Sequence, residues 1–122
     1  MERNFQKIMR AIVTSSNSWS DEQAVIQAIC ELPAGTVVLL PMQSGACGVI
    51  RKNADDLKLE VEDWTINDPN YDYGRNGGSL NAKMIQSDID ICFAFIDKNA
   101  HMAKDLVRRA RSMDLEVRVF EE

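Results

Sequence analysis

The chain has 122 residues, of which 45% are hydrophobic and 27% are charged, and these values are ordinary for one globular domain. Its 19 acidic and 14 basic side chains leave a net charge of −5, which repels a nucleic-acid backbone unless basic residues gather locally. No apolar run is long enough to span a membrane, and three cysteines with a single histidine do not supply an ordinary metal site. We therefore expect a soluble, cytoplasmic protein without metal or cofactor, which binds neither a membrane nor a nucleic-acid polymer.

The stretch that organises the chain lies near its start. A continuous apolar run at residues 11–13 predicts a buried strand, and small polar residues follow at 14–18. Ser20 and Asp21 are favoured N-cap residues for the helix that the apolar spacing predicts over residues 21–32. In a doubly wound sheet, ligands bind where a strand, a polar loop and a helix start meet in this way.

The rest of the chain repeats this alternation of strands and helices. Because strands separated by helices pair in parallel with right-handed crossovers, we predict an α/β, Rossmann-like, three-layer domain over residues 10–122. Its five-stranded parallel sheet has the order 3-2-1-4-5, and residues 1–9 form an N-terminal extension. The further predicted strands are 36–40, 59–64, 89–96 and 116–120, the further helices are 49–59, 79–87 and 100–113, and residues 66–78 form a long loop.

This strand order predicts one crevice at the topological switch point between the first and fourth strands. Residues 14–18 and 97–102 flank it, and residues 42–48 form its third wall. Hydroxyl and amide groups beside a helix start stabilise an anion such as phosphate by about 0.3–2 kcal/mol. The alternative is that these residues serve only as turn and cap residues. The predicted phosphate ligands are Thr14, Ser15, Ser16 and Asn17.

Further candidate ligand-binding residues lie in the later loops. Small residues let a backbone approach a ligand closely, although helix packing favours them as well. Tyrosines with an arginine can stack on a base, or they can simply cover the edge of the core. The candidates are Ser44, Gly45 and Gly48 in the second loop, Tyr71, Tyr73 and Arg75 in the long loop, and Asn81, His101 and Met102 beyond it.

Short motifs along nearly the whole chain from Arg10 form a pattern. They are Val13-Thr14-Ser15-Ser16-Asn17 before Trp19-Ser20-Asp21, then Val61-Glu62-Asp63-Trp64, Asn81 with Met84, Asp90 before Ala94-Phe95, and Arg108-Arg109-Ala110 before Val117-Arg118-Val119. This pattern resembles the YspA-like branch of the SLOG superfamily. The resemblance implies a Rossmann-like fold, a homo-oligomer, and binding of a nucleotide or a nucleotide-derived signal, notably in bacterial and phage conflict systems.

Two motifs depart from that family. Residues 13–17 stand where the branch has V-T-G-S-R, and residues 40–47 stand where it has H-G-G-A-x-G-A-D. The family's R-N pair corresponds either to Arg75-Asn76 or to Leu80-Asn81. The phosphoribohydrolase signature P-G-G-x-G-T-x-x-E is absent. A binding role is therefore favoured over an inherited catalytic role, and no catalytic residue is assigned.

Three hypotheses follow. The first is non-catalytic binding of a nucleotide-derived small molecule, for sequestration or sensing, including phage counter-defence. The second is an enzyme that hydrolyses an N-glycosidic or phosphate-ester bond of a nucleotide with Asp63, Asp97 or a loop carboxylate as its base. A nucleophilic Cys47 is less favoured than a structural one. The third is a protein-interaction module whose vestigial pocket is filled by Met42 and Met102.

Overall fold

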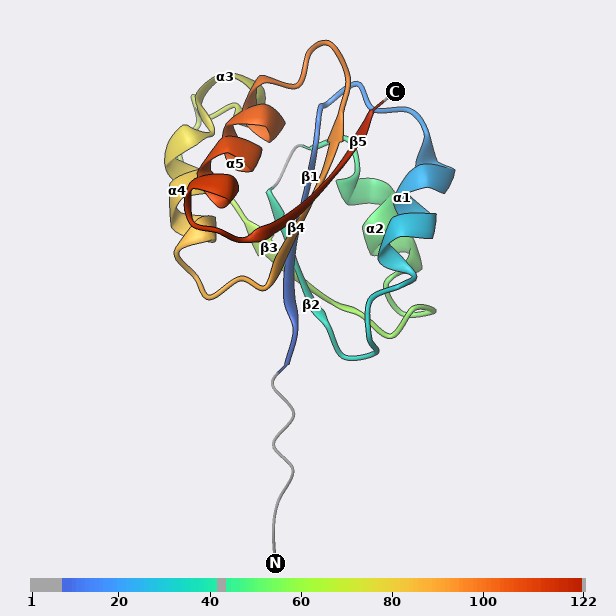
Figure 1. The fold of residues 1–122 in the computed structure, drawn as a ribbon. Helices are drawn as coiled ribbons and strands as arrows, with labels where there is room; N and C mark the ends of the chain where they lie inside the picture. Colours follow the sequence, from blue (N-terminus) through green and yellow to red (C-terminus); the bar gives the residue numbers. More distant parts are fainter. Residues whose placement is uncertain (1–7, 42–43, 122) are drawn as a thin grey trace, which may run out of the picture.

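The computed structural model describes residues 8–41 and 44–121. Of residues 74 and 75 it describes only the backbone. Strands and helices alternate along this part of the chain (Figure 1). The strands are β1 (Arg10–Ser15), β2 (Val37–Pro41), β3 (Glu60–Trp64), β4 (Ile91–Ile96) and β5 (Glu116–Glu121), and the helices are α1 (Glu22–Ile29), α2 (Cys47–Asn53), α3 (Tyr73–Asn76), α4 (Gly78–Ile85) and α5 (His101–Ser112).

The five strands form one parallel sheet in the order β3-β2-β1-β4-β5. This confirms the predicted Rossmann-like fold and strand order. In the central pair, Ser15 at the end of β1 lies beside Phe95 near the end of β4. The loops that follow these two strands therefore start side by side.

Helices cover both faces of the sheet. In Figure 1, α1 and α2 lie on one side of the strands, and α3, α4 and α5 lie on the other. The central strands β1 and β4 are buried along nearly their whole length, whereas β3 and β5 alternate between half-buried and exposed residues. This difference explains why the central strands have continuous apolar runs and the edge strands have alternating ones.

Two predicted elements differ in extent. The predicted loop over residues 66–78 contains the short helix α3. Two hydrogen bonds of 2.8 Å each stabilise it: Asp72 N donates to the side chain of Asn76, and Asn76 N donates to the carbonyl of Asp72. Helix α2 ends at Asn53, earlier than predicted, and the chain then turns into β3 through Lys58, whose φ of 57° lies in the left-handed region.

Among the described residues, no helix combines the length and the apolar character needed to cross a membrane.

Candidate functional site

A polar cavity of 430 Å³ lies at the carboxyl ends of β1 and β4. The loop after β1, the start of α3 and the start of α5 surround it, so the structure brings together the two segments that the strand order places at the switch point. The residues that line it are Ser15, Ser16, Asn17, Ser18, Asp72, Tyr73, Asn99 and Met102.

A buried hydrogen-bond network around Tyr73 fixes the floor of this cavity. The Tyr73 hydroxyl donates to Asn81 Oδ1 over 2.9 Å, so in its 2.8 Å bond with Thr14 it is the threonine that donates. Asn81 Nδ2 donates both to the Met102 carbonyl and to the Asp105 carboxylate, over 2.9 and 3.0 Å. Thr14 and Asn81 are therefore left without a spare side-chain donor for a ligand.

Burial also determines the protonation state of the Tyr73 hydroxyl. The Tyr73 side chain is 1% exposed, and burial raises the pKa of its hydroxyl more than the hydrogen bonds with Thr14 and Asn81 lower it. The phenol is therefore neutral at physiological pH. Tyr73 lines the cavity from within the core cluster on the α4 side, which agrees with the alternative that the tyrosines cover the edge of the core; stacking on a base stays a prediction.

Two neighbouring serines of the first loop differ in their hydrogen bonds. Ser15 Oγ accepts from Ala46 N over 2.8 Å and donates to the carbonyl of Ser16 over 3.0 Å. Ser16 is itself 3% exposed, and its hydroxyl oxygen has no hydrogen-bond partner among the described residues. Leaving such a group unsatisfied costs about 1–3 kcal/mol, so Ser16 is the group in this cavity that a ligand would satisfy.

The N-termini of α1 and α5 differ in how well they would bind an anion. At α1, the Asp21 carboxylate accepts from Ala24 N over 3.1 Å, and Glu22 adds a second negative charge to the first turn. At α5, the N-cap residue Ala100 has no side-chain oxygen, and the first turn has no acidic residue. Because the first N–H groups of a helix attract anions, the geometry favours the start of α5 over the start of α1.

Carboxylates give the cavity an acidic side. Asp97 accepts hydrogen bonds from the Ser18 hydroxyl and, over 2.8 Å, from Asn99 N. The Ser18 hydroxyl is the main cause that lowers the pKa of Asp97, and the nearby Ser16 hydroxyl adds to the effect although it does not meet hydrogen-bond geometry. Asp72 lines the cavity, and none of the lining residues is basic among the described side chains, which do not include that of Arg75. These carboxylates can accept hydrogen bonds from hydroxyl or amino groups, and they oppose a highly charged anion.

The described residues of the second loop, 44–48, support the first loop and are not among the residues that line the cavity. Gly45 N donates to the carbonyl of Ser16 over 3.0 Å, and a Cβ on Gly45 would lie 2.5 Å from that same oxygen. A Cβ on Gly48, in contrast, would meet nothing within 4 Å. The small size of Gly45 is thus explained by packing between the two loops.

The other polar residues of the second loop bond locally. Ser44 Oγ lies 3.2 Å from Cys47 Sγ, and the Cys47 thiol donates to the carbonyl of Pro41 over 3.0 Å. This arrangement agrees with a structural Cys47. Residues 42 and 43, which include the Met42 of the third hypothesis, lie outside the described residues.

Of the remaining candidates, Met102 is half-buried and lines the cavity, and His101 is exposed beside it. Tyr71 packs against the core on the α4 side, and burial raises its pKa. The Arg75 side chain lies outside the described residues. Tyr71 and His101 are not among the lining residues, so their roles stay predictions.

Sequence reasoning did not single out Ser18, Asp72 and Asn99 as ligand-binding residues. Ser18 and Asn99 lie in the two segments expected to flank the crevice, so their position was implied by the strand order. Asp72 lies directly before α3, and its N–H donates to the side chain of Asn76, four residues further along the chain, over 2.8 Å.

No protein-family model matches the chain, and no curated protein sequence matches it. The SLOG assignment therefore rests on the short motifs and remains a prediction.

Proposed function

We propose that this protein binds a nucleotide-derived small molecule without changing it chemically, and so senses or sequesters a signalling nucleotide. The observation that carries the proposal is the buried hydroxyl of Ser16, in the wall of a polar cavity at the switch point, which has no hydrogen-bond partner in the part of the chain that the structure describes. The resemblance to the SLOG superfamily is the reason for choosing a nucleotide, including one that acts in phage counter-defence.

The polarity of the cavity suggests how such a ligand lies. An anionic group binds at the start of α5, where the first-turn N–H groups and Ser16 Oγ supply donors. Hydroxyl groups of a ribose, or an amino group of a base, donate to Asp72 and Asp97. Because two carboxylates repel further negative charge, a cyclic mononucleotide or an ADP-ribose-type molecule fits better than a nucleoside triphosphate.

The candidate bases argue for binding over hydrolysis. Asp63 lies on the edge strand β3 and pairs with Arg51, and it is not among the residues that line the cavity. Asp97 is near the cavity, but its lowered pKa makes it a weak base. The Tyr73 hydroxyl is committed to Asn81. A binding role is therefore favoured over the nucleotide-hydrolase alternative.

The test uses a panel of cyclic mononucleotides, cyclic dinucleotides and ADP-ribose-type nucleotides. The purified protein is incubated with each compound, native mass spectrometry measures bound mass, and chromatography of the released compound checks that it is intact. We expect near-stoichiometric binding of at least one intact compound. Hydrolysis of a panel member would support the enzyme instead, and absence of binding across the panel would contradict the proposal.

A pair of serine variants tests the location. Ser16→Ala should weaken binding of the identified compound by about 10- to 100-fold, because a hydrogen bond to a charged group is lost. Ser112→Ala makes the same change at an exposed serine near the end of α5 and should bind like the wild type. Equal affinity of Ser16→Ala and the wild type would remove Ser16 from the site.

A further inference from the structure

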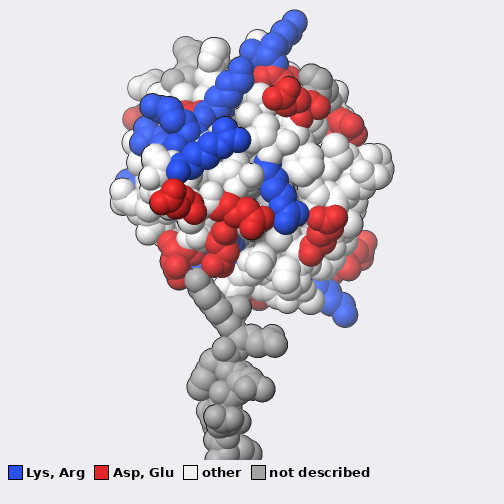
Figure 2. All heavy atoms as spheres, viewed as in Figure 1, with Lys and Arg blue, Asp and Glu red and all other residues white. Residues whose placement is uncertain are grey.

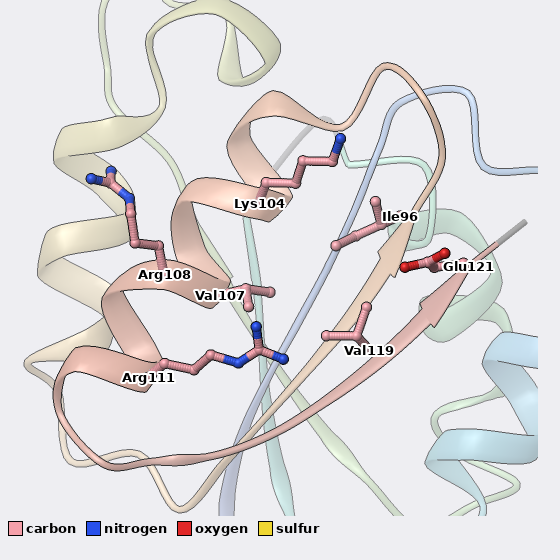
Figure 3. A pocket seen from close by; sticks show the side chains of 7 residues that line it. All are labelled: Ile96, Lys104, Val107, Arg108, Arg111, Val119 and Glu121. Carbon is pink, nitrogen blue, oxygen red and sulfur yellow. The ribbon is translucent and has the colours of Figure 1, made fainter.

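A second hollow, of 530 Å³, lies between α5 and the last two strands (Figure 3). Its floor is apolar and consists of Ile96 from β4, Val107 from α5 and Val119 from β5. Figure 3 shows these side chains in the gap between the helix and the strands, with Arg111 extending across the gap toward the strands. The charged residues of its rim are Lys104, Arg108 and Arg111 from α5 and Glu121 from β5.

The rim is mainly basic although the whole chain has a net charge of −5. Lys104, Arg108 and Arg111 follow one another at intervals of four and three residues, so they share one side of α5. In Figure 2, lysine and arginine atoms gather over this helix. Arg108 pairs with Asp105, whereas Lys104 and Arg111 form no ion pair within the described part of the chain. Like charges at this spacing destabilise a helix slightly, so this row of basic side chains on α5, the α5 stripe, would be stabilised by a partner with negative charge.

The hollow borders an edge of the sheet. Within the described residues, β5 lies at one end of the strand order and β3 at the other, so each has one side without a neighbouring strand. Val119 packs against α5, whereas Phe120 stacks on Phe95 on the opposite face, with 4.8 Å between ring centroids. Because side chains alternate along a strand, Arg118 lies on the same face as Phe120.

The opposite edge strand has complementary side chains. On β3, Trp64 packs into the core cluster on the α4 side, and Val61 packs into the cluster on the α1 and α2 side. Alternation therefore places Glu60 and Glu62 on the face of Trp64, and Asp63 on the face of Val61. On the face that carries α5, β3 thus presents carboxylates and an indole, whereas β5 lies beside cations and an apolar floor.

We propose that a second copy of this chain docks its β3 edge, in parallel, along the β5 edge and its basic hollow. Glu60 of one copy then faces Lys104 and Arg111 of the other, and Glu62, which pairs with Arg10 of its own copy over 3.2 Å, adds a second carboxylate on that face. On the opposite face, the alternation brings Val61 toward Phe120. Asp63 and Arg118 lie on that face as well, and each already forms an ion pair within its own copy. This contact is independent of the proposed function and does not involve the cavity at the switch point.

The contact is necessarily head-to-tail. Two copies that met through the same α5 stripe would bring cations against cations, whereas β3 against β5 brings opposite charges together. Each added copy leaves one β3 edge and one β5 edge exposed, so association continues to longer assemblies or closes into a ring.

The experiment is sedimentation velocity of the full chain at increasing concentration. The wild type should form assemblies larger than a dimer at about 0.1 M salt and should dissociate at about 1 M salt, where the screening length falls from about 10 to about 3 Å. A wild type that remains monomeric at every concentration at low salt would overturn the proposal.

Edge variants test the geometry. Lys104→Glu combined with Arg111→Glu disables the β5 edge, and Glu60→Arg disables the β3 edge; each should weaken self-association about tenfold or more. A 1:1 mixture of the two variant proteins should associate again, because the intact β3 edge of one meets the intact β5 edge of the other and the two charge-reversed edges also carry opposite charges. Failure of the mixture to associate, or association of the variants like the wild type, would contradict the head-to-tail contact.

Two controls separate an interface effect from a folding effect. Lys83→Glu changes the charge equally at an exposed position of α4 outside the hollow, and should assemble like the wild type. All variants should retain the thermal unfolding midpoint of the wild type, because the altered side chains are exposed or lie at the rim.

Discussion

Helix α5 borders two hollows of opposite character. At its N-terminal end, the cavity beside β1 is polar and is lined by the Asp72 carboxylate and by the Ser16 hydroxyl, which has no partner among the described residues. Along its outer side, the hollow beside β5 has an apolar floor and a rim that includes Lys104 and Arg111. Both belong to one helix of 12 residues, so their difference comes from what faces the helix: the ends of central strands in one case, and an edge strand in the other.

The largest effect on stability is expected from replacing Asn81, whose hydrogen bonds hold the helix that borders both hollows. Asn81 bonds to Tyr73, to the Met102 carbonyl and to Asp105, and so holds α5 against the rest of the domain. Asn81→Leu should reduce the free energy of unfolding by about 2–3 kcal/mol, because buried polar groups lose their partners. Urea unfolding measures this loss. Tyr73→Phe, which removes a single hydroxyl, should cost less; an equal or larger loss would show that Asn81 is not the centre of the network.

The next effect distinguishes the two glycines of the second loop. Gly45→Ala should destabilise the domain by about 1–3 kcal/mol, because its Cβ would lie 2.5 Å from the Ser16 carbonyl oxygen and push the first loop away. Gly48→Ala is the matched change in open space within α2 and should leave stability unchanged or raise it by up to about 1 kcal/mol. Thermal unfolding compares the two. Equal midpoints would mean that the loops do not pack as described.

A smaller effect separates the two serines of the first loop. Ser15→Ala should cost about 1–2 kcal/mol, because Ala46 N is left buried without its acceptor. Ser16→Ala should not destabilise the protein, since the hydroxyl that it removes has no partner among the described residues. Denaturant unfolding without ligand measures both. A loss at Ser16 as large as that at Ser15 would indicate that Ser16 serves the fold and not a ligand.

The smallest effect depends on pH. Burial acts to raise the pKa of Asp105, but hydrogen bonds from Asn81, Arg109 and Arg108 outweigh burial and leave the pKa below its usual value. The stabilisation from Asp105 is therefore complete above the unfolded pKa of about 3.9 and is lost as pH falls through the lower folded pKa.

Asp105→Asn should consequently be less stable than the wild type at pH 7, by about 1 kcal/mol, because the partners Arg108 and Arg109 are solvent-exposed although Asp105 itself is only 12% exposed. The difference between the two proteins should shrink as the solution is acidified below that unfolded pKa. Unfolding midpoints measured across the acid range check this. A difference that stays constant with pH would mean that the charge of Asp105 does not contribute.

Sequence patterns determined the fold of this protein. Continuous apolar runs predicted the buried β1 and β4, and the alternating pattern of residues 59–64 and 116–120 predicted the edge strands, because burial on one or both faces of a sheet leaves a local period in the sequence. The strand order followed from parallel crossovers, and it located the cavity between the loops after β1 and β4.

Only the tertiary structure decided the chemistry of the two hollows. Ser15 and Ser16 are identical side chains in adjacent positions, and they differ because Ala46 N, 31 residues along the chain, bonds to Ser15 alone. Likewise, α1 and α5 both follow polar loops, but Asp21 caps α1 whereas α5 starts at Ala100 without a side-chain cap. Local patterns record which residues are buried. Whether a polar group is already satisfied depends on partners that the fold brings from far along the chain.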